Sequence, residues 1–431
     1  MIISQYFPPD ISGGGTRAFN YAKCLAMQNF DVTVITAFPH LHTKIPKKFR
    51  FKLVHKEKME GFELIRVRVP SLLHTSAKNR IILHSSFLIS CMIPIFSIKP
   101  DVVFASEPNL FSIIPAFFYS KLRGSSVIRV VDDLWPEALY ERGYVKSKLL
   151  KRFLNKLTKF SYTYAKFIFP LTEIGKQIIH ESYNIVNDKI IVLNHGVDTN
   201  IFRYTKPTKK DEFVLMYSGS FVESYDFDLI INAAEKLQNE KMKIILRGKG
   251  TLLPYLENKI KEKKLKNIII DKEIVPLEQI SKKLSEADVF LIPMKNEIAL
   301  NSTLPTKILE YQAMGRPIIC CSEGAPGIYV DKTRSGIKIK YENLNEFIKA
   351  IEKLKSEIKL REELGQNGKK YADENLTFEI VGKILSRCIH LDNFILGRWD
   401  SSDLDKFYLV QMKFQLTWNG KKLTWMGILS R

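Results

Sequence analysis

Short runs of β-branched and aromatic residues alternate with segments of helical periodicity along most of this chain. The runs that predict strands lie at 31–36, 101–105, 126–131, 167–171 and 190–193 in the first half, and at 213–217, 243–246, 267–270, 289–292 and 317–320 in the second. Strands that alternate with helices build parallel sheets from βαβ units. We therefore predict an α/β fold of two doubly wound, Rossmann-like domains that face a cleft, where ligands bind beyond the carboxyl ends of the strands.

A polar, lysine-containing stretch at 199–212 separates the two series of strands. It predicts an N-terminal domain at 1–198, a linker at 199–212 and a second domain at 213–370, followed by a helix at 371–387 that returns to the first domain. From 388 to 431 the alternation stops. Residues 406–424 indicate a short hairpin with its turn at Asn419-Gly420, and the pattern suggests no role for this tail.

The charge balance favours an anionic partner. The chain has 66 basic and 46 acidic residues, a net charge of +20. This favours nucleic acid, a membrane surface or a phosphorylated ligand. The 5 cysteines lack zinc-ligand or disulfide-framework spacing, so we expect a reduced, intracellular chain without a metal. The N-terminus does not resemble a signal peptide. The apolar stretch 81–98 contains His84 and Pro94 and predicts a buried or membrane-grazing helix rather than a span.

The most informative segment is 301–317. Pro305 stands where a helix begins, and Gly315 and Pro317 stand where one ends, so we predict a short helix at 305–314. Lys307 in the first turn opposes the helix dipole, and a bound phosphate would reverse that cost. Glu310, one turn further on the same face, offers a carboxylate to sugar hydroxyls. The alternative is a surface lysine and a solvated glutamate on an ordinary helix.

Two further segments place polar groups at strand ends. Gly13-Gly14-Gly15 precedes a helix that carries Arg17 in its first turn, so the backbone can approach an anion closely. Ala18 breaks the G-x-G-x-x-G fingerprint, and a tight turn is the alternative. Asp132 and Asp133 end a strand, and at most one faces the cleft. We favour Asp133, with a helix N-cap as its alternative role.

Two other patterns do not indicate a metal. Asp226-Phe227-Asp228 looks like a D-x-D motif, but it precedes an amphipathic helix, so we expect Asp228 to be the N-cap. The 8 histidines show no ligand spacing, and His195 is expected to be structural or to line the cleft.

The segment 145–167 combines basic and apolar residues and contains no acidic residue. Lys148, Lys151, Arg152 and Lys156 are interleaved with leucines and a phenylalanine, as in a basic amphipathic helix on an anionic membrane. The alternative is an ordinary amphipathic helix in a lysine-rich protein. Nucleic acid is disfavoured because no stacking aromatics or known binding motifs accompany the basic residues.

Five motifs together resemble the family 4 glycosyltransferases of the GT-B fold, closest to the WbuB/WcaI-like group of bacterial capsule and O-antigen enzymes. The similarity spans roughly residues 1 to 386. In chain order the motifs are Ser4 to Pro9 with Gly13 to Arg17, then Asp133 to Pro136, Asn194 to Asp198, Tyr217 to Gly219, and Pro305 to Pro317.

The resemblance implies transfer of a sugar from a nucleotide-sugar, with retention and without a metal or other cofactor. Glu310 matches the second glutamate of the family's motif, which holds the ribose, but Ser302 stands at the position of the first. Serines also stand near the positions of the family's basic pair, at Ser220 and Ser224. We then expect Lys307 to be the cation that binds the diphosphate, with Arg247 and Lys249 as reserve cations. The further residues that we expect at the donor site are Gly14, Gly15, Arg17, Gly219, Ser302 and Thr306.

We therefore expect a glycosyltransferase that uses a UDP-linked donor in a front-face mechanism, with Asp133 touching the sugar or acceptor. Its acceptor would be a polyprenyl-phosphate-linked sugar of O-antigen, lipopolysaccharide or capsule synthesis, at the cytoplasmic face of the plasma membrane. Two alternatives stay open: a nucleotide-sugar epimerase of the same fold, and a membrane-associated binding protein with a decayed site.

Overall fold

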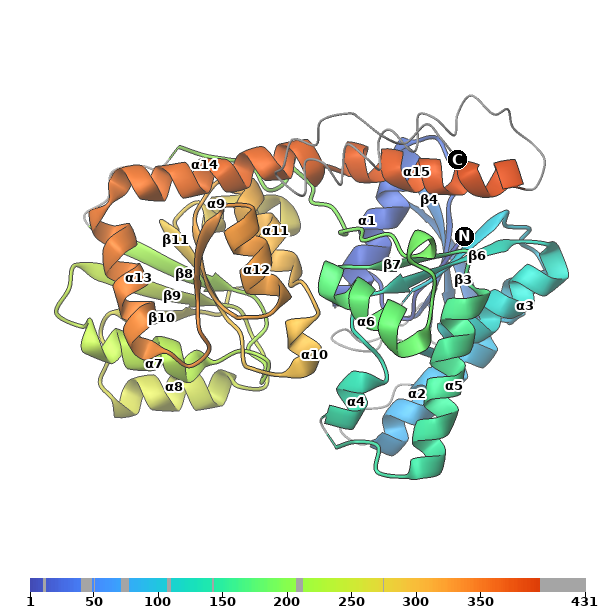
Figure 1. Ribbon diagram of the computed structural model, residues 1–431, viewed down its shortest axis with the longest axis horizontal. Helices are drawn as coiled ribbons and strands as arrows, with labels where there is room; N and C mark the ends of the chain where they lie inside the picture. Colours follow the sequence, from blue (N-terminus) through green and yellow to red (C-terminus); the bar gives the residue numbers. More distant parts are fainter. Residues whose placement is uncertain are drawn as a thin grey trace, which may run out of the picture. The chain divides into compact units, whose positions relative to one another are not determined.

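The structure, a computed structural model, describes residues 1–10, 13–39, 49, 51–70, 77–106, 110–141, 143–206, 212–273 and 275–395. Met1–Gly382 forms one compact unit, and the chain from Lys383 onward belongs to a second. The predicted hairpin at 406–424 lies outside the described residues. Both predicted sheets are present in the first unit, each with helices packed against it (Figure 1).

The first sheet has seven strands in the order β3-β4-β2-β1-β5-β6-β7. Its pairs are parallel except for β3 with β4, which is antiparallel. The strands are β1 (Ile2–Ile3), β2 (Thr33–Ala37), β3 (Val54–Met59), β4 (Phe62–Val67), β5 (Val102–Ala105), β6 (Ser126–Val131) and β7 (Phe167–Pro170). The helices of this region are α1 (Gly13–Met27), α2 (Ala77–Ser90), α3 (Ile113–Arg123), α4 (Glu137–Glu141), α5 (Lys148–Tyr164) and α6 (Glu173–Tyr183), with 3-10 turns at Ile93–Phe96, Leu110–Ser112 and Asn187–Lys189.

The second sheet has six parallel strands in the order β10-β9-β8-β11-β12-β13. Its strands are β8 (Phe213–Ser218), β9 (Met242–Arg247), β10 (Ile268–Asp271), β11 (Val289–Pro293), β12 (Ile318–Cys321) and β13 (Gly336–Ile339). The helices are α7 (Phe227–Lys236), α8 (Leu253–Glu262), α9 (Leu277–Leu284), α10 (Ile298–Asn301), α11 (Thr306–Ala313), α12 (Ala325–Lys332), α13 (Leu344–Ser356), α14 (Ile358–Asn375) and α15 (Phe378–Ile395). The prediction of two Rossmann-like domains with parallel sheets is confirmed.

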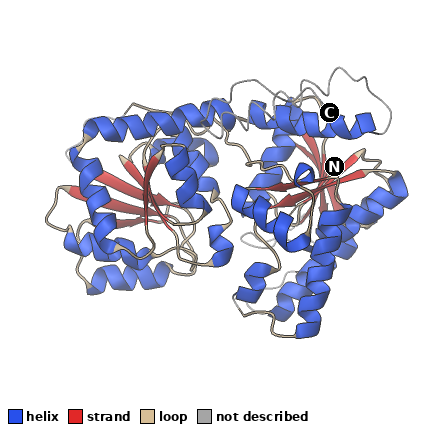
Figure 2. Cartoon of the chain, viewed as in Figure 1, coloured by secondary structure: helices blue, strands red, loops and turns tan. Residues whose placement is uncertain are grey.

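The central strands β8, β11 and β12 of the second sheet are apolar on both faces, and helices cover both faces of the sheet (Figure 2). Phe213, Leu215 and Tyr217 of β8 pack into one hydrophobic cluster, which includes residues of α7 and α13. Val214 and Met216 point the other way, into a cluster that includes residues of α11 and α12. This two-sided burial explains why β8 reads as a continuous apolar run.

Three predicted elements differ from the structure. Residues 190–193 form no strand beyond a single bridge between Ile190 and Ile168. In place of one helix at 371–387, α14 ends at Asn375 and α15 begins at Phe378. At this break the Leu376 carbonyl accepts a hydrogen bond from Val197 N–H (2.8 Å). The apolar stretch 81–98 is divided between α2 and the 3-10 turn at Ile93–Phe96.

The described helices include none that is both long and apolar enough to cross a membrane. All five cysteines are free and buried.

The Arg17 side chain connects the carboxyl ends of neighbouring strands in the first sheet. Its side chain is fully buried, and its guanidinium donates to the carbonyls of Val131 (2.9 Å), Phe169 (3.0 Å) and Leu193 (2.7 Å). It also pairs with Asp132 at 2.8 Å and donates to the Tyr21 hydroxyl. One α1 side chain therefore holds β6, β7 and the segment after Ile190 in register. This corrects the expectation that Arg17 binds the donor, because its donors are already used.

Arg17→Ala is expected to lower the free energy of unfolding by about 3–5 kcal/mol, since it removes a fully buried charge that pairs with Asp132 and donates to three backbone carbonyls. The measurement is chemical denaturation followed by circular dichroism. Arg123→Ala is the matched control: this arginine also donates to carbonyls, those of Ile95 and Phe96, but is only partly buried. It should cost about 1 kcal/mol. Equal losses from the two substitutions would contradict the role given to Arg17.

Candidate functional site

Lys307 lies in the first turn of α11 with its ammonium held against two tyrosines. Nζ donates a hydrogen bond to the Tyr217 hydroxyl (2.7 Å) and lies 4.1 Å and 4.0 Å from the ring centroids of Tyr217 and Tyr225. Ring faces attract a cation but replace its water poorly. Burial accordingly lowers the Lys307 pKa to about 7, although the negative charge of Glu310 acts in the opposite direction. Near neutral pH the protonated and neutral forms of this lysine are therefore both populated.

Glu310 lies one helical turn beyond Lys307, and its pKa moves the other way. Burial raises the Glu310 pKa to about 7, and the positive charge of Lys307 opposes that shift. Within the described part of the chain, the carboxylate accepts no hydrogen bond. The two groups therefore form an electrostatically coupled pair whose carboxylate is available to a ligand.

The N-terminus of α11 adds unpaired donors beside this pair. Pro305 is the N-cap and provides no side-chain hydrogen bond. The first N–H groups of a helix have no partner within the helix, and among the described residues no hydrogen bond engages those of Thr306 and Lys307. They are therefore available to an anion. The predicted helix at 305–314 thus agrees with α11, Thr306–Ala313.

Tyr311 of α11 fixes this helix to the end of β8. Its hydroxyl donates to the Ser218 carbonyl (3.0 Å) and accepts from the Ser218 N–H (2.8 Å), and its ring stacks on Phe290 at 3.8 Å. Gly219 follows at once, with φ of +152°. A Cβ at this position would lie 2.4 Å from Lys307 Nζ. The glycine is therefore needed for the lysine to occupy its place against the tyrosines.

Tyr225 is a site residue that the sequence did not reveal. Burial raises its pKa, and the charges of Cys320, Asp133 and Glu310 raise it further. Asp133, from the end of the first sheet, thus lies close enough to act on the same tyrosine as Glu310. An aromatic residue just before an amphipathic helix is usually read as core, so no sequence signal distinguished Tyr225.

Ser302 and Arg247, two residues that were expected to contact the donor, form hydrogen bonds within the protein instead. Ser302 is buried. Its hydroxyl donates to the Ala299 carbonyl and its own carbonyl accepts from the Thr172 hydroxyl (2.6 Å), so it does not replace the missing glutamate. The guanidinium of Arg247 is bound by Asp271 and by the Glu273 carbonyl, which leaves it unavailable as a reserve cation.

Lys249 is exposed after β9. Gly14 and Gly15 belong to the first turn of α1 and not to a loop before it, which corrects that expectation. The N-cap of α7 is Asp226, which accepts from Leu229 N–H (3.0 Å) and replaces Asp228 in the role predicted for it. Asp228 instead accepts from the Tyr255 hydroxyl. Among the described residues, no group of three or more His, Cys, Asp or Glu side chains could hold a metal.

His195 is buried, as expected for a structural histidine. Burial lowers its pKa to about 3, with a smaller contribution from the positive charge of Arg17. The imidazole is therefore neutral at pH 7.

The basic helix predicted at 145–167 is α5, and Ser147 caps it by accepting from Leu150 N–H. Lys148, Arg152 and Lys156 are exposed, and Lys151 lies over the Tyr140 ring. Large apolar side chains are exposed on the same helix: Leu149 by 78%, Phe153 by 53%, Leu150 by 42% and Phe160 by 40%. An ordinary amphipathic helix of a soluble domain would bury most of them.

Two family models and several known proteins match this chain. The family model "Glycosyltransferase Family 4" matches residues 11–201, and the model "Glycosyl transferases group 1" matches residues 198–371. WcaI of Escherichia coli (strain K12), named as a colanic acid biosynthesis glycosyl transferase, is 20% identical over 339 residues, which cover 74% of this chain and 81% of WcaI.

Solved structures share the fold at low sequence identity. Sucrose-phosphate synthase from Thermosynechococcus elongatus superposes with a TM-score of 0.72 at 14% identity, over 92% of this chain and 98% of that one. Anabaena HepE in complex with UDP and glucose gives a TM-score of 0.66 at 10% identity, over 90% and 98%. The sequence prediction is confirmed: this chain is a glycosyltransferase that belongs to family 4, and its two Rossmann-like domains form the GT-B fold.

Proposed function

We propose that this protein is a retaining, metal-independent glycosyltransferase that moves a hexosyl or N-acetylaminosugar unit from a UDP-linked donor to a polyprenyl-phosphate-linked sugar. The observation that carries the proposal is the desolvated Lys307–Glu310 pair at the uncapped N-terminus of α11. A diphosphate there would meet an ammonium and free N–H groups, and the ribose would meet a carboxylate. The HepE structure, which holds UDP and glucose, supports UDP as the nucleotide of the donor.

The reaction that we propose assigns a role to each of these groups. The acceptor hydroxyl attacks the anomeric carbon on the face from which the diphosphate departs, and its proton passes to the departing phosphate oxygen. Lys307 and the α11 N-terminus stabilise the negative charge that develops on this leaving group. Glu310 holds the ribose, and Asp133 contacts the sugar or the acceptor. Positioning and charge stabilisation thus supply most of the catalysis.

The acceptor side of the proposal rests on α5. Its exposed lysines and apolar side chains suit an anionic membrane surface, where each basic residue contributes about 1 kcal/mol. Further apolar side chains are exposed on α2 and on the 3-10 turn that follows it, Ile89 by 68% and Phe96 by 85%. A protein that works at the cytoplasmic face of the plasma membrane on a lipid-linked sugar would use such a surface. WcaI, named for colanic acid synthesis, supports a role in surface polysaccharide synthesis.

Calorimetric titration of UDP should show saturable binding that Lys307→Ala weakens at least tenfold, because a charge-assisted hydrogen bond contributes about 1.5–3 kcal/mol. Glu310→Ala should weaken UDP binding by about tenfold, because the contact with the ribose is lost. Lys353→Ala on the exposed face of α13 is the charge-matched control. GDP, ADP and NAD are titrated in parallel. UDP affinity that is unaffected by both site substitutions, or conversion of a UDP-sugar without acceptor, would contradict the proposal.

The pH dependence of UDP-glucose binding should be bell-shaped, with its maximum near pH 7. Above pH 7 free Lys307 loses its proton, so binding must restore it and the affinity falls by up to about tenfold per pH unit. Below pH 7 Glu310 becomes protonated and accepts hydrogen bonds less well. Lys307→Ala should abolish the alkaline limb and Glu310→Gln the acid limb. A flat profile between pH 6 and pH 8.5 in the unmodified protein would show that neither group binds the donor.

Gly219→Ala should displace Lys307 and weaken UDP binding to about the level of Lys307→Ala. The added Cβ would lie 2.4 Å from Nζ. Gly124→Ala is the control, because Gly124 also has positive φ (+72°) but a Cβ there meets nothing within 4 Å. It should cost about 1 kcal/mol of stability and leave UDP affinity unchanged. In the double variant Gly219→Ala/Lys307→Ala, the two losses of UDP affinity should not add. Additive losses would mean that Gly219 acts by another route.

A further inference from the structure

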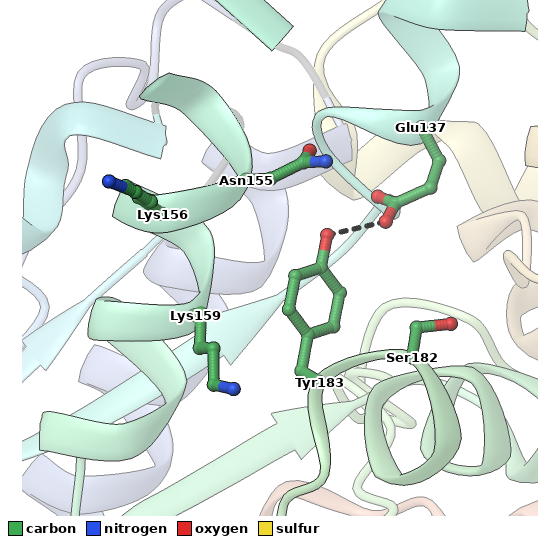
Figure 3. A pocket seen from close by; sticks show the side chains of 6 residues that line it. All are labelled: Glu137, Asn155, Lys156, Lys159, Ser182 and Tyr183. Atoms are coloured by element: carbon green, nitrogen blue, oxygen red, sulfur yellow. Dashed lines mark hydrogen bonds between the residues drawn. The ribbon is translucent and has the colours of Figure 1, made fainter. Parts of the chain in front are cut away.

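A cavity lined by polar side chains, none of them from the Lys307–Glu310 pair, lies among α4, α5 and α6. Its volume is about 280 Å³, and it is lined by Glu137, Asn155, Lys156, Lys159, Ser182 and Tyr183 (Figure 3). Small-molecule pockets usually start at about 300 Å³. The cavity is therefore too small for a nucleotide-sugar and suits a headgroup of about one sugar.

The hydrogen bonds around this cavity leave specific groups open. Tyr183 donates its hydroxyl to Glu137 Oε1 at 2.5 Å, as Figure 3 shows. The other carboxylate oxygen, Oε2, is buried and has no hydrogen-bond partner among the described residues. Asn155 Oδ1 accepts from the Tyr140 hydroxyl (2.7 Å), which leaves the amide N–H groups of Asn155 to donate. A buried carboxylate oxygen without a donor costs free energy, so a hydroxyl-bearing ligand would relieve it.

The charges around the cavity favour an anion. Lys156 and Lys159 stand one turn apart on α5, both exposed, and in the described part of the chain neither ammonium forms an ion pair. Together they outweigh the single carboxylate of Glu137. The ligand that complements both features carries a phosphate for the lysines and a hydroxyl for Glu137 Oε2.

We propose that this cavity binds the phosphorylated sugar headgroup of the lipid-linked acceptor, with the phosphate on Lys156 and Lys159 and a sugar hydroxyl donating to Glu137. The inference deepens the proposed function and rests on its acceptor side. The apolar side chains exposed on α5, Leu149, Leu150 and Phe153, lie on the helix that carries both lysines, so a lipid tail would have apolar surface beside the cavity.

The position of α4 connects this cavity to the donor side. Glu137 begins α4 shortly after Asp133 in the chain, and Glu141 at its end accepts a hydrogen bond from the Ala299 N–H of α10 (2.8 Å). A headgroup held by Glu137 therefore binds the same short segment that carries Asp133 and that contacts the second sheet's domain.

The test is calorimetric titration of glucose 1-phosphate, glycerol 1-phosphate and inorganic phosphate into the full chain. Glucose 1-phosphate is expected to bind most tightly. Lys156→Ala/Lys159→Ala should weaken all three ligands roughly tenfold or more, since both charge-assisted contacts are lost. Glu137→Gln should weaken glucose 1-phosphate but leave inorganic phosphate unchanged or tighter, because it removes a hydroxyl acceptor and a repulsive charge together. Lys349→Ala/Lys353→Ala on α13 is the charge-matched control.

Two outcomes would overturn the inference. One is equal binding of inorganic phosphate and glucose 1-phosphate that is indifferent to Glu137→Gln. The other is binding to phosphatidylglycerol vesicles that saturating glucose 1-phosphate does not reduce, which would assign the lysines to bulk lipid. UDP affinity, measured on the same samples, separates the proposals. Intact UDP binding with no headgroup binding defeats only this inference, and the reverse result defeats only the donor site.

Discussion

The arrangement of the first sheet depends on the hydrogen bonds of the buried Arg17 guanidinium. It joins helix α1 to the ends of β6 and β7, and it pairs with Asp132, the neighbour of Asp133. A buried charge is costly unless its hydrogen bonds are satisfied, and here carbonyls, a carboxylate and the Tyr21 hydroxyl satisfy them. The position of Asp133, and of the α4 segment after it, follows from this fixed strand end.

The second sheet contains the opposite case, a charged pair that the fold leaves incompletely satisfied. The Lys307 pKa of about 7 lies below its unfolded value of 10.5, so this group destabilises the fold at pH values below 10.5. The Glu310 pKa of about 7 lies above its unfolded value of 4.5, so this group destabilises the fold at pH values above 4.5. Both costs are therefore present at neutral pH. A ligand that brings an anion to Lys307 and hydroxyls to Glu310 would recover them, which is why we place the donor there.

The sequence predicted those features that depend on periodicity and on helix boundaries. The strand at 126–131 and the helix around Lys307 and Glu310 appear almost as expected, because apolar runs and the Pro305 and Gly315 boundaries act locally. The β3 strand was missed because it is a polar edge strand with no apolar run. Arg17 was misread because its partners are distant in sequence, so only the fold shows that its donors are used. Tyr225 was missed because an aromatic residue before an amphipathic helix is usually read as core, and its contact with Lys307 spans 82 positions of the sequence.

The central claim is that Lys307 has a lowered pKa in the free protein and becomes protonated when it binds the diphosphate of the donor. NMR of lysine side-chain ¹³Cε and ¹⁵Nζ resonances, assigned with Lys307→Ala, measures this directly across pH. We expect a Lys307 pKa of about 7 in the free protein, which UDP-glucose raises toward the ordinary lysine value. A Lys307 pKa near 10.5 in the free protein, unchanged by UDP-glucose, would contradict the account.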